Sequence, residues 1–180
     1  MVALRLFIAI NFNEQVKNEI HEVIKKVEKI ASKGRFVKKE HMHLTLEFLG
    51  EIPPERVGEL ISVMKCIDVP PFILELAGLG YFTRRGGDVY WLGIKESKSL
   101  LVMQNNIHKL LMDKGFLLQE REYIPHITIG REVKLARPFE QDVLNSIISN
   151  IKIHVNSIEL MKSERIKGRL VHQSVFSKFL

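Results

Sequence analysis

Two short segments with the same pattern constrain this chain most: His-Leu-Thr-Leu at 43–46 and His-Ile-Thr-Ile at 126–129. In both segments polar and aliphatic residues alternate, which is the period of a half-buried β-strand. The second segment lies 83 residues after the first in a chain of 180 residues, and a similar succession of apolar and amphipathic stretches surrounds each. The spacing therefore predicts an internal duplication.

The order predicted for each half is strand, helix, histidine-bearing strand, helix, strand. The predicted strands cover 4–12, 42–48, 71–82, 88–94, 124–130, 151–162 and 169–179. The predicted helices start after Asn13 and end at Gly34, cover about 57–64, start at Ser97 and end at Gly115, and cover about 138–149. No linker rich in Gly, Ser or Pro separates the halves. We therefore expect one α+β domain over 1–180, with halves at approximately 1–84 and 88–180. Its two pseudo-twofold-related lobes of antiparallel sheet, with flanking helices, should surround a central cleft.

The polar residues of the two segments predict a shared site. Residues two apart in a strand point to the same face, so His43 projects with Thr45 and His126 with Thr128. A pseudo-twofold axis between the halves would bring the two polar faces into one cavity. There a neutral imidazole can take a proton from an attacking water while an imidazolium protonates a departing ribose oxygen. Each such transfer contributes about 10²–10⁴-fold to a rate. The threonine hydroxyls can donate to the non-bridging oxygens of a phosphate. The motifs thus predict phosphodiester chemistry.

Four longer stretches carry a resemblance to a known family. They are RLFIAI at 5–10, HLTLEFLG at 43–50, VYWLGI at 89–94 and YIPHITIGR at 123–131. Together they resemble the two-histidine phosphoesterase superfamily with its HxTx motifs. Within it they are most similar to the RNA 2′,3′-cyclic phosphodiesterases, also called LigT-like 2′-5′ RNA ligases. The resemblance covers nearly the whole chain.

The resemblance implies both an activity and a set of residue roles. The activity is hydrolysis of a ribose 2′,3′-cyclic phosphate at an RNA end to a 2′-phosphate, together with a reversible, ATP-independent 2′-5′ ligation of such an end to a 5′-hydroxyl. His43 would be the general acid that protonates the 3′-oxygen, and His126 the general base that activates water. Thr45, Thr128 and Arg131 would bind the phosphate. From the residues alone the two histidine roles are interchangeable.

Three further side chains have competing interpretations. By strict alternation Arg131 points away from His126, unless Gly130 permits a bulge that redirects it; a solvated surface arginine is the alternative. Tyr123 is a possible base or ribose contact. Phe48 has the parity of Leu44 and Leu46, which favours core packing. The remaining histidines carry weaker expectations: His41 at the start of a strand, His21 and His108 on helix surfaces, and His154 and His172 on the last strands, where one of them can line the cleft.

A metal or cofactor finds little support. His43, Glu47 and His126 can be drawn together as a two-histidine, one-carboxylate metal set. However, the partner of each histidine is threonine, which is a poor ligand, and no third histidine or aspartate cluster is evident. No phosphate-binding GxxxxGK[ST] loop is present. We expect no metal and no cofactor. The lone Cys66 cannot form an internal disulfide and is expected to be buried near the end of a helix.

The charge balance favours an anionic partner. The formal net charge is +6, which suits nucleic acid. We expect the partner to be RNA with a 2′,3′-cyclic phosphate end, such as a tRNA fragment in RNA processing. We also expect a cytoplasmic monomer without a membrane segment, because no apolar run approaches the roughly 18–20 residues that span a bilayer. Two alternatives stay open: a phosphodiesterase of the same superfamily acting on small cyclic nucleotides, and a non-catalytic RNA-binding module.

Overall fold

The computed structural model describes residues 2–136, 145–146, 148 and 150–180, and in this part of the chain the strands form two antiparallel sheets. The four-stranded sheet contains, in spatial order, β3 (His43–Ile52), β1 (Leu4–Asn11), β8 (Ser157–Ile166) and β9 (Arg169–Phe179). The five-stranded sheet contains β2 (Ala31–Phe36), β6 (His126–Leu135), β5 (Asp88–Ile94), β4 (Phe72–Phe82) and β7 (Lys152–Val155). The expected α+β class with two antiparallel sheets is confirmed.

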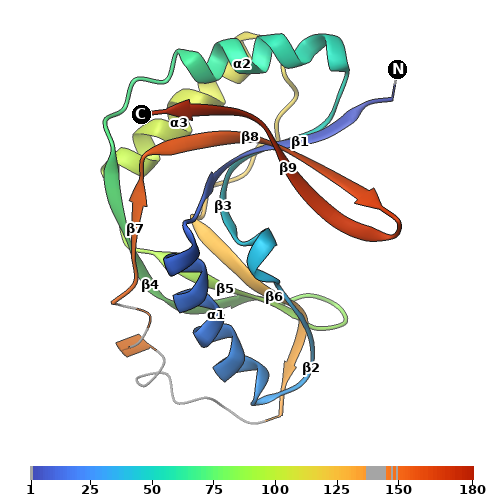
Figure 1. The fold of residues 1–180 in the computed structure, drawn as a ribbon, viewed down its shortest axis with the longest axis vertical. Coiled ribbons are helices and arrows are strands. Elements are labelled where there is room, and N and C mark those ends of the chain that lie inside the picture. Colours follow the sequence, from blue (N-terminus) through green and yellow to red (C-terminus); the bar gives the residue numbers. More distant parts are fainter. Residues whose placement is uncertain (1, 137–144, 147, 149) are drawn as a thin grey trace.

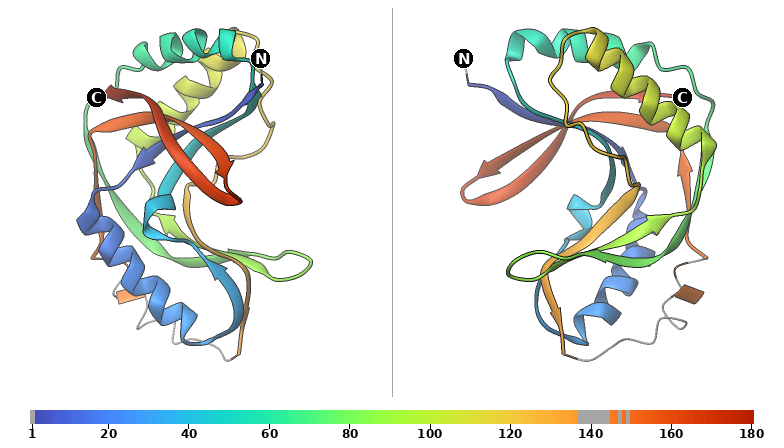
Figure 2. Two further views of the ribbon diagram at one scale, coloured as in Figure 1. Left: turned by 45° about the vertical axis from the view of Figure 1, so that its right-hand side comes forward. Right: turned by 180° about the vertical axis from the view of Figure 1, so that it is seen from behind.

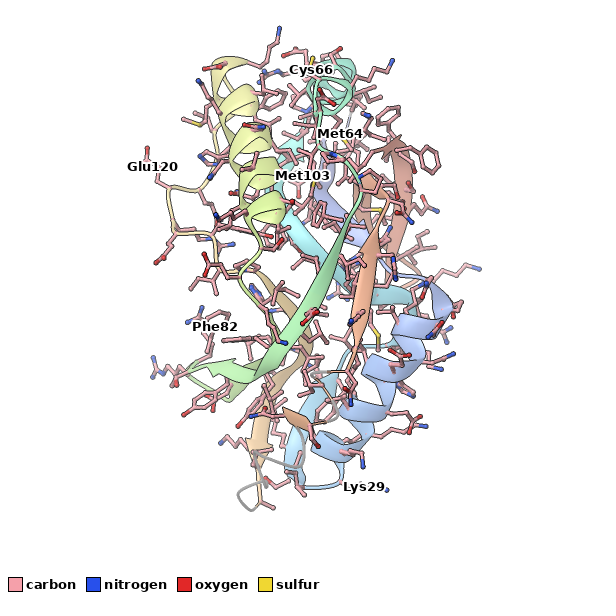
Figure 3. All side chains as sticks on the ribbon, turned by 90° about the vertical axis from the view of Figure 1, so that its left-hand side faces the viewer. Lys29, Met64, Cys66, Phe82, Met103 and Glu120 are labelled. Atoms are coloured by element: carbon pink, nitrogen blue, oxygen red, sulfur yellow. The ribbon has the colours of Figure 1, made fainter. Side chains whose placement is uncertain are left out.

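The helices cover the outer faces of the sheets. Helices α2 (Val57–Lys65) and α3 (Lys98–Asp113) lie together over the four-stranded sheet, and α1 (Glu14–Glu28) lies against the five-stranded sheet (Figures 1 and 2). Met64 on α2 and Met103 on α3 are fully buried in the core beneath these helices (Figure 3). One continuous apolar core joins residues from both sheets. The two lobes are therefore packed on each other.

Each sheet draws strands from both halves of the sequence. The four-stranded sheet combines β1 and β3 from the first half with β8 and β9 from the second. The crossover occurs at Asn156, where the chain leaves β7 in one sheet and enters β8 in the other. The single strand predicted over 151–162 is therefore wrong: it is two strands in different sheets. The exchange explains why the chain forms one body without a linker.

Local sequence signals placed most helix ends correctly. The Asn13 side chain accepts a hydrogen bond from the Val16 amide at 2.9 Å and starts α1. Ser97 accepts from the Leu100 amide at 3.3 Å and starts α3. Gly115 follows α3 with a φ of 72°, the left-handed conformation that glycine adopts freely.

The end of α1 differs from the prediction. The helix ends at Glu28, and Ala31–Phe36, which contains Gly34, forms β2. This segment lacks the apolar stripe of the helix and instead pairs with β6, so the long-range ladder decides its conformation. Cys66 is also not buried: it caps α2 and is exposed (Figure 3). The helix predicted over about 138–149 falls mostly outside the described residues.

Two connections project from one side of the molecule. The β8–β9 hairpin and the loop between β4 and β5 both extend beyond the body, with the region around β3 and β6 between them (Figures 1 and 2). Both tips carry exposed cations: Arg84 and Arg85 in one, and Arg165, Lys167 and Arg169 in the other. No helix in the described ranges is long and apolar enough to cross a membrane.

Candidate active site

The two histidine-bearing strands approach each other where the two sheets meet. Strand β3 is the edge of the four-stranded sheet, and the first residues of β6 extend past its pairing with β2. The two strands contact each other there (Figure 1). The His-x-Thr motifs, distant in sequence, are therefore neighbours in the fold.

Both motif histidines are held by the same backbone hydrogen bond. His43 Nδ1 lies 2.8 Å from the carbonyl oxygen of His41, and His126 Nδ1 lies 2.7 Å from that of Ile124. A carbonyl oxygen only accepts, so Nδ1 carries the hydrogen in both rings. Each imidazole is thus oriented by the residue two positions before it, and Nε2 is left for chemistry. Both rings are therefore held in the same tautomer, with the hydrogen on Nδ1.

A β-bulge follows each motif and shifts the alternation by one residue. In β3, Ala9 pairs with Thr45 and Ile8 with Glu47, so Leu46 is the extra residue. In β6, Trp91 pairs with Thr128 and Tyr90 with Gly130, so Ile129 is the extra residue. The second residue after each extra residue is exposed: this is Phe48 in β3 and Arg131 in β6. We call the side of each strand that carries the motif histidine and threonine its site face.

The bulges decide two questions that the sequence left open. Arg131 is exposed on the site face, as the bulge alternative required. Phe48 is 44% exposed, so its expected core position is wrong. Phe48 lies on the His43 side of its strand, because the Phe7 ring contacts the rings of both (centroids 4.9 Å to His43 and 6.3 Å to Phe48).

A pocket of about 350 Å³ combines residues from both motifs. Thr45 and Phe48 line it from β3 and His126 from β6, and Phe82 at the end of β4 closes another wall (Figure 3). The Phe82 ring stands edge-on to His126 at 5.3 Å between centroids. His43, Thr128 and Arg131 are not among the residues that line this pocket. Aromatic walls with a few polar groups are typical of sites for organic ligands.

Tyr123 lies on the pocket wall with its hydroxyl already engaged. The hydroxyl donates to the carbonyl oxygen of Thr45 at 3.0 Å, and burial raises the pKa of the phenol. This bond ties the segment before His126 to the first motif. For the base or ribose contact considered for Tyr123, the ring face and the acceptor side of the hydroxyl oxygen remain available.

Glu47 pairs with residues of α3. Its carboxylate is buried, with 8% of the residue exposed, and lies 2.7 Å from His108 Nδ1 and 3.5 Å from the Gln104 amide nitrogen. Among the described residues, no three His, Cys, Asp or Glu side chains are grouped as a metal site. The set of His43, Glu47 and His126 is therefore not assembled. His108, expected on a helix surface, lines the pocket instead.

The electrostatics of the free site favour neutral imidazoles. Burial, followed by the nearby His172, lowers the pKa of His43 from 6.5 to about 4. Burial also lowers the pKa of His126, with smaller effects of Arg121 and Arg131. The charge of Arg131 also lowers the pKa of His43, so this charge acts on both imidazoles. An anionic phosphate between them opposes these effects and favours a proton on either imidazole.

Two histidines near the site were not distinguished by the sequence. His172 on β9 contacts the rings of His43 and His41, and His41 also supplies the carbonyl that holds His43. Residue parity along β9 would predict that His172 faces the site only if the register of β9 against β8 were known. That register is set by the pairing of strands that lie far apart in the sequence.

Comparisons with known proteins agree with this architecture. The model of the LigT like Phosphoesterase family matches residues 10–91 and 92–172. An RNA 2′,3′-cyclic phosphodiesterase of Thermotoga maritima is 32% identical over 89% of this chain and 87% of its own length. One from Methanocaldococcus jannaschii is 35% identical over 71% of each chain. Crystal structures of Escherichia coli LigT, in apo form and complexed with 3′-AMP, superpose with TM-scores of 0.85 and 0.84 at 26% identity, over 99% of this chain and 98% of theirs. The chain therefore belongs to the LigT-like phosphoesterase family.

Proposed function

We propose that this protein hydrolyses 2′,3′-cyclic phosphates at RNA ends to 2′-phosphates, with His43 and His126 as a metal-independent acid–base pair. The observation that carries the proposal is the matched pair of Nδ1 bonds to the carbonyls of His41 and Ile124. These bonds leave two Nε2 atoms, on strands that contact each other, for proton transfer. The names of the relatives support the substrate class.

The proposed reaction proceeds by one in-line displacement at phosphorus. Neutral His126 takes a proton from water, and the water oxygen forms a bond to phosphorus. The bond between phosphorus and the 3′-oxygen breaks, and protonated His43 gives its proton to that oxygen. The product has a 2′-phosphate and a 3′-hydroxyl, and the proton gained by His126 balances the one lost by His43. The same steps in the same direction, with a 5′-hydroxyl in place of water as the nucleophile, give a 2′-5′ link and a 3′-hydroxyl without ATP.

Thr45, Thr128 and Arg131 are assigned to the phosphate. Both threonines lie on the site face beside the histidines, where their hydroxyls can donate to non-bridging oxygens. Arg131 adds a positive charge whose effect reaches both imidazoles. The arriving phosphate also explains how His43 can serve as the acid although its pKa is about 4 in the free site: the anion stabilises the imidazolium next to it.

The aromatic pocket is assigned to the base of the terminal nucleotide. Phe48, Phe82 and the ring of Tyr123 line it next to Thr45 and His126. Aromatic side chains that stack on bases contribute about 1–3 kcal/mol per base. Arg84 and Arg121 lie on the same walls. The β8–β9 hairpin and the β4–β5 loop project on one side of the molecule (Figure 2), and we assign a longer RNA strand to that side. We propose that the protein acts as a monomer on such strands, including tRNA fragments.

One experiment tests this proposal against its rivals. An RNA oligonucleotide with a 2′,3′-cyclic phosphate is incubated with the protein in EDTA, and the product end is identified. The expected product is a 2′-phosphate, formed by wild type and strongly reduced in His43→Ala and His126→Ala. Equal kcat/KM on a cyclic mononucleotide would favour the small-nucleotide phosphodiesterase. Binding without turnover would favour the RNA-binding module. Turnover that requires a divalent ion would contradict the metal-independent mechanism.

A further inference from the structure

The ring of His43 is packed against aromatic side chains from two separate elements. Phe7 on β1 packs against it at 4.9 Å between centroids, tilted by 36°. His172 on β9 meets it edge-on at 5.4 Å and 71°. His172 in turn contacts Phe7 at 5.2 Å and His41 at 4.9 Å. The rings of Phe7, His43 and His172 thus contact one another pairwise, and His41 joins this cluster through His172.

We propose that His172 is a positioning residue for His43, which acts by holding the His43 ring between itself and Phe7 so that Nε2 is presented to the phosphate. The inference rests on the proposed role of His43. It assigns a role in the reaction to β9, the last strand, which carries neither motif. The Nδ1 bond to His41 holds one edge of the ring, and small coupled changes of the two side-chain torsions can still tilt the ring while that bond is kept. Contacts from Phe7 and His172 remove this freedom.

His126 provides the comparison within the same molecule. It has the same Nδ1 bond to a backbone carbonyl, and its ring neighbours are Phe82 at 5.3 Å and Trp91 at 6.1 Å. A titratable imidazole is therefore present in the support of His43, whereas two non-titrating rings support His126. The two histidines differ at this point, although each has the same hydrogen bond to a backbone carbonyl.

The charged groups around the cluster are few and can be named. His172 and His41 face His43 from β9 and from the short helix at Lys39–His41, and Arg131 acts from β6. On β8, Ser163 pairs with His172 across the ladder. Lys162 and Glu164 alternate to the opposite face and pair with each other at 2.9 Å. All the titratable groups that act on His43 are cations or bases, so each added proton in the cluster disfavours a proton on His43.

The first test measures the ring of His43 directly. Histidine signals are titrated by NMR in wild type, His172→Ala and His172→Phe, without substrate. Because burial and then His172 are the main causes of the low pKa of His43, removal of the ring should raise that pKa by about one unit or more. Phenylalanine keeps the packing and removes the charge, so it should fold and give a smaller rise. His154→Ala is the matched control, since His154 is an exposed histidine on β7.

The second test asks whether His172 acts through His43. Alanine at 172 should lower kcat on the cyclic-phosphate RNA by about 10- to 100-fold, while KM changes little. In a His43→Ala background the same substitution should have no further effect, because the ring that it positions is gone. An equal loss in both backgrounds, or an unchanged titration of His43, would overturn the inference. Failure of the proposed function can be distinguished from failure of this inference. If the proposed function is wrong, wild type shows no turnover, while the NMR titration still shows whether His172 acts on the ring of His43.

Discussion

Phe48 and Arg131 occupy equivalent positions in the two halves, each five residues after a motif histidine and on the site face of its strand. Bulges at Leu46 and Ile129 place both of them there. The same backbone device therefore presents an aromatic ring on one side of the site and a guanidinium on the other. This asymmetry suits a ligand with a base at one end and a phosphate at the other.

The first prediction concerns this pair. Replacement of Arg131 by Gln should lower kcat/KM by about 10²-fold, equally for short and long RNA, because a charge at the reacting phosphate is lost. Lysine at 131 should recover part of the rate, since it restores the charge without the planar fork. Phe48→Ala should instead weaken binding by about 1–3 kcal/mol. Steady-state kinetics on oligonucleotides separate the two effects. The reverse pattern would mean that Phe48 lies at the phosphate and Arg131 at the base.

A second prediction tests the bulge in β6. A Cβ atom at Gly130 would approach Val133 Cγ2 to 2.8 Å and Phe36 Cδ1 to 3.1 Å. Gly130→Ala should therefore destabilise the protein by about 1–3 kcal/mol through overpacking. Gly58→Ala in α2 is the matched control, because a Cβ there meets nothing within 4 Å. Urea unfolding measures both, and equal stability of the two variants would contradict the close packing at Gly130.

The third prediction is the pH dependence of the reaction. One imidazole must be protonated and the other neutral, so the rate should depend on pH as a bell-shaped curve. The two apparent pKa values of this curve belong to the coupled pair and not to either histidine alone. The pKa of both histidines is lowered in the free enzyme, mainly by burial. The maximum of kcat/KM should therefore lie below pH 6.5. The pH profile of kcat should be shifted to higher pH, because the bound phosphate raises the pKa of both histidines. A kcat/KM maximum above pH 7 would contradict the burial of the pair.

Stability should follow the same protonation. The pKa of His43 falls from 6.5 to about 4 on folding, chiefly through burial. Between these values the unfolded chain binds more protons than the native protein, so stability rises with pH in this window. Acidification from pH 6.5 to 4 should lower the melting temperature, and His43→Ala should make that decrease smaller. Thermal unfolding of both proteins over this range provides the measurement.

The fourth prediction concerns the projecting β8–β9 tip. Arg165, Lys167 and Arg169 are all exposed, so their joint replacement by Gln should leave folding intact. If they contact an RNA backbone, the salt dependence of binding to a long strand should decrease by about two units of log–log slope. A cyclic mononucleotide should be turned over as by wild type. An unchanged slope would place the strand elsewhere on the surface.

The last prediction assigns the two histidines. Alanine at 43 or 126 should each lower turnover by about 10²–10⁴-fold. A substrate whose leaving oxygen is much less basic needs little protonation. With it, His43→Ala should recover most of its rate and His126→Ala should not. The opposite recovery would mean that the acid and base are exchanged.

The sequence by itself determined the elements whose signals are local. The alternation in the two motifs identified strands that carry His43 and His126, because side-chain direction in the regular part of a strand follows residue parity. Asn13, Ser97 and Gly115 marked helix ends through hydrogen bonds and a dihedral angle that involve their immediate neighbours. The candidate acid–base pair and its threonines needed no more than this.

Only the tertiary structure decided the features that depend on a distant partner. The bulges that turn Phe48 and Arg131 outward arise from pairing with β1 and β5. Asn156 separates two strands because the neighbours of those strands lie in different sheets. His172 reaches His43 only through the ladder of β1, β8 and β9. In each case the register between strands far apart in the chain sets which side chains meet, and local propensity carries no information about that register.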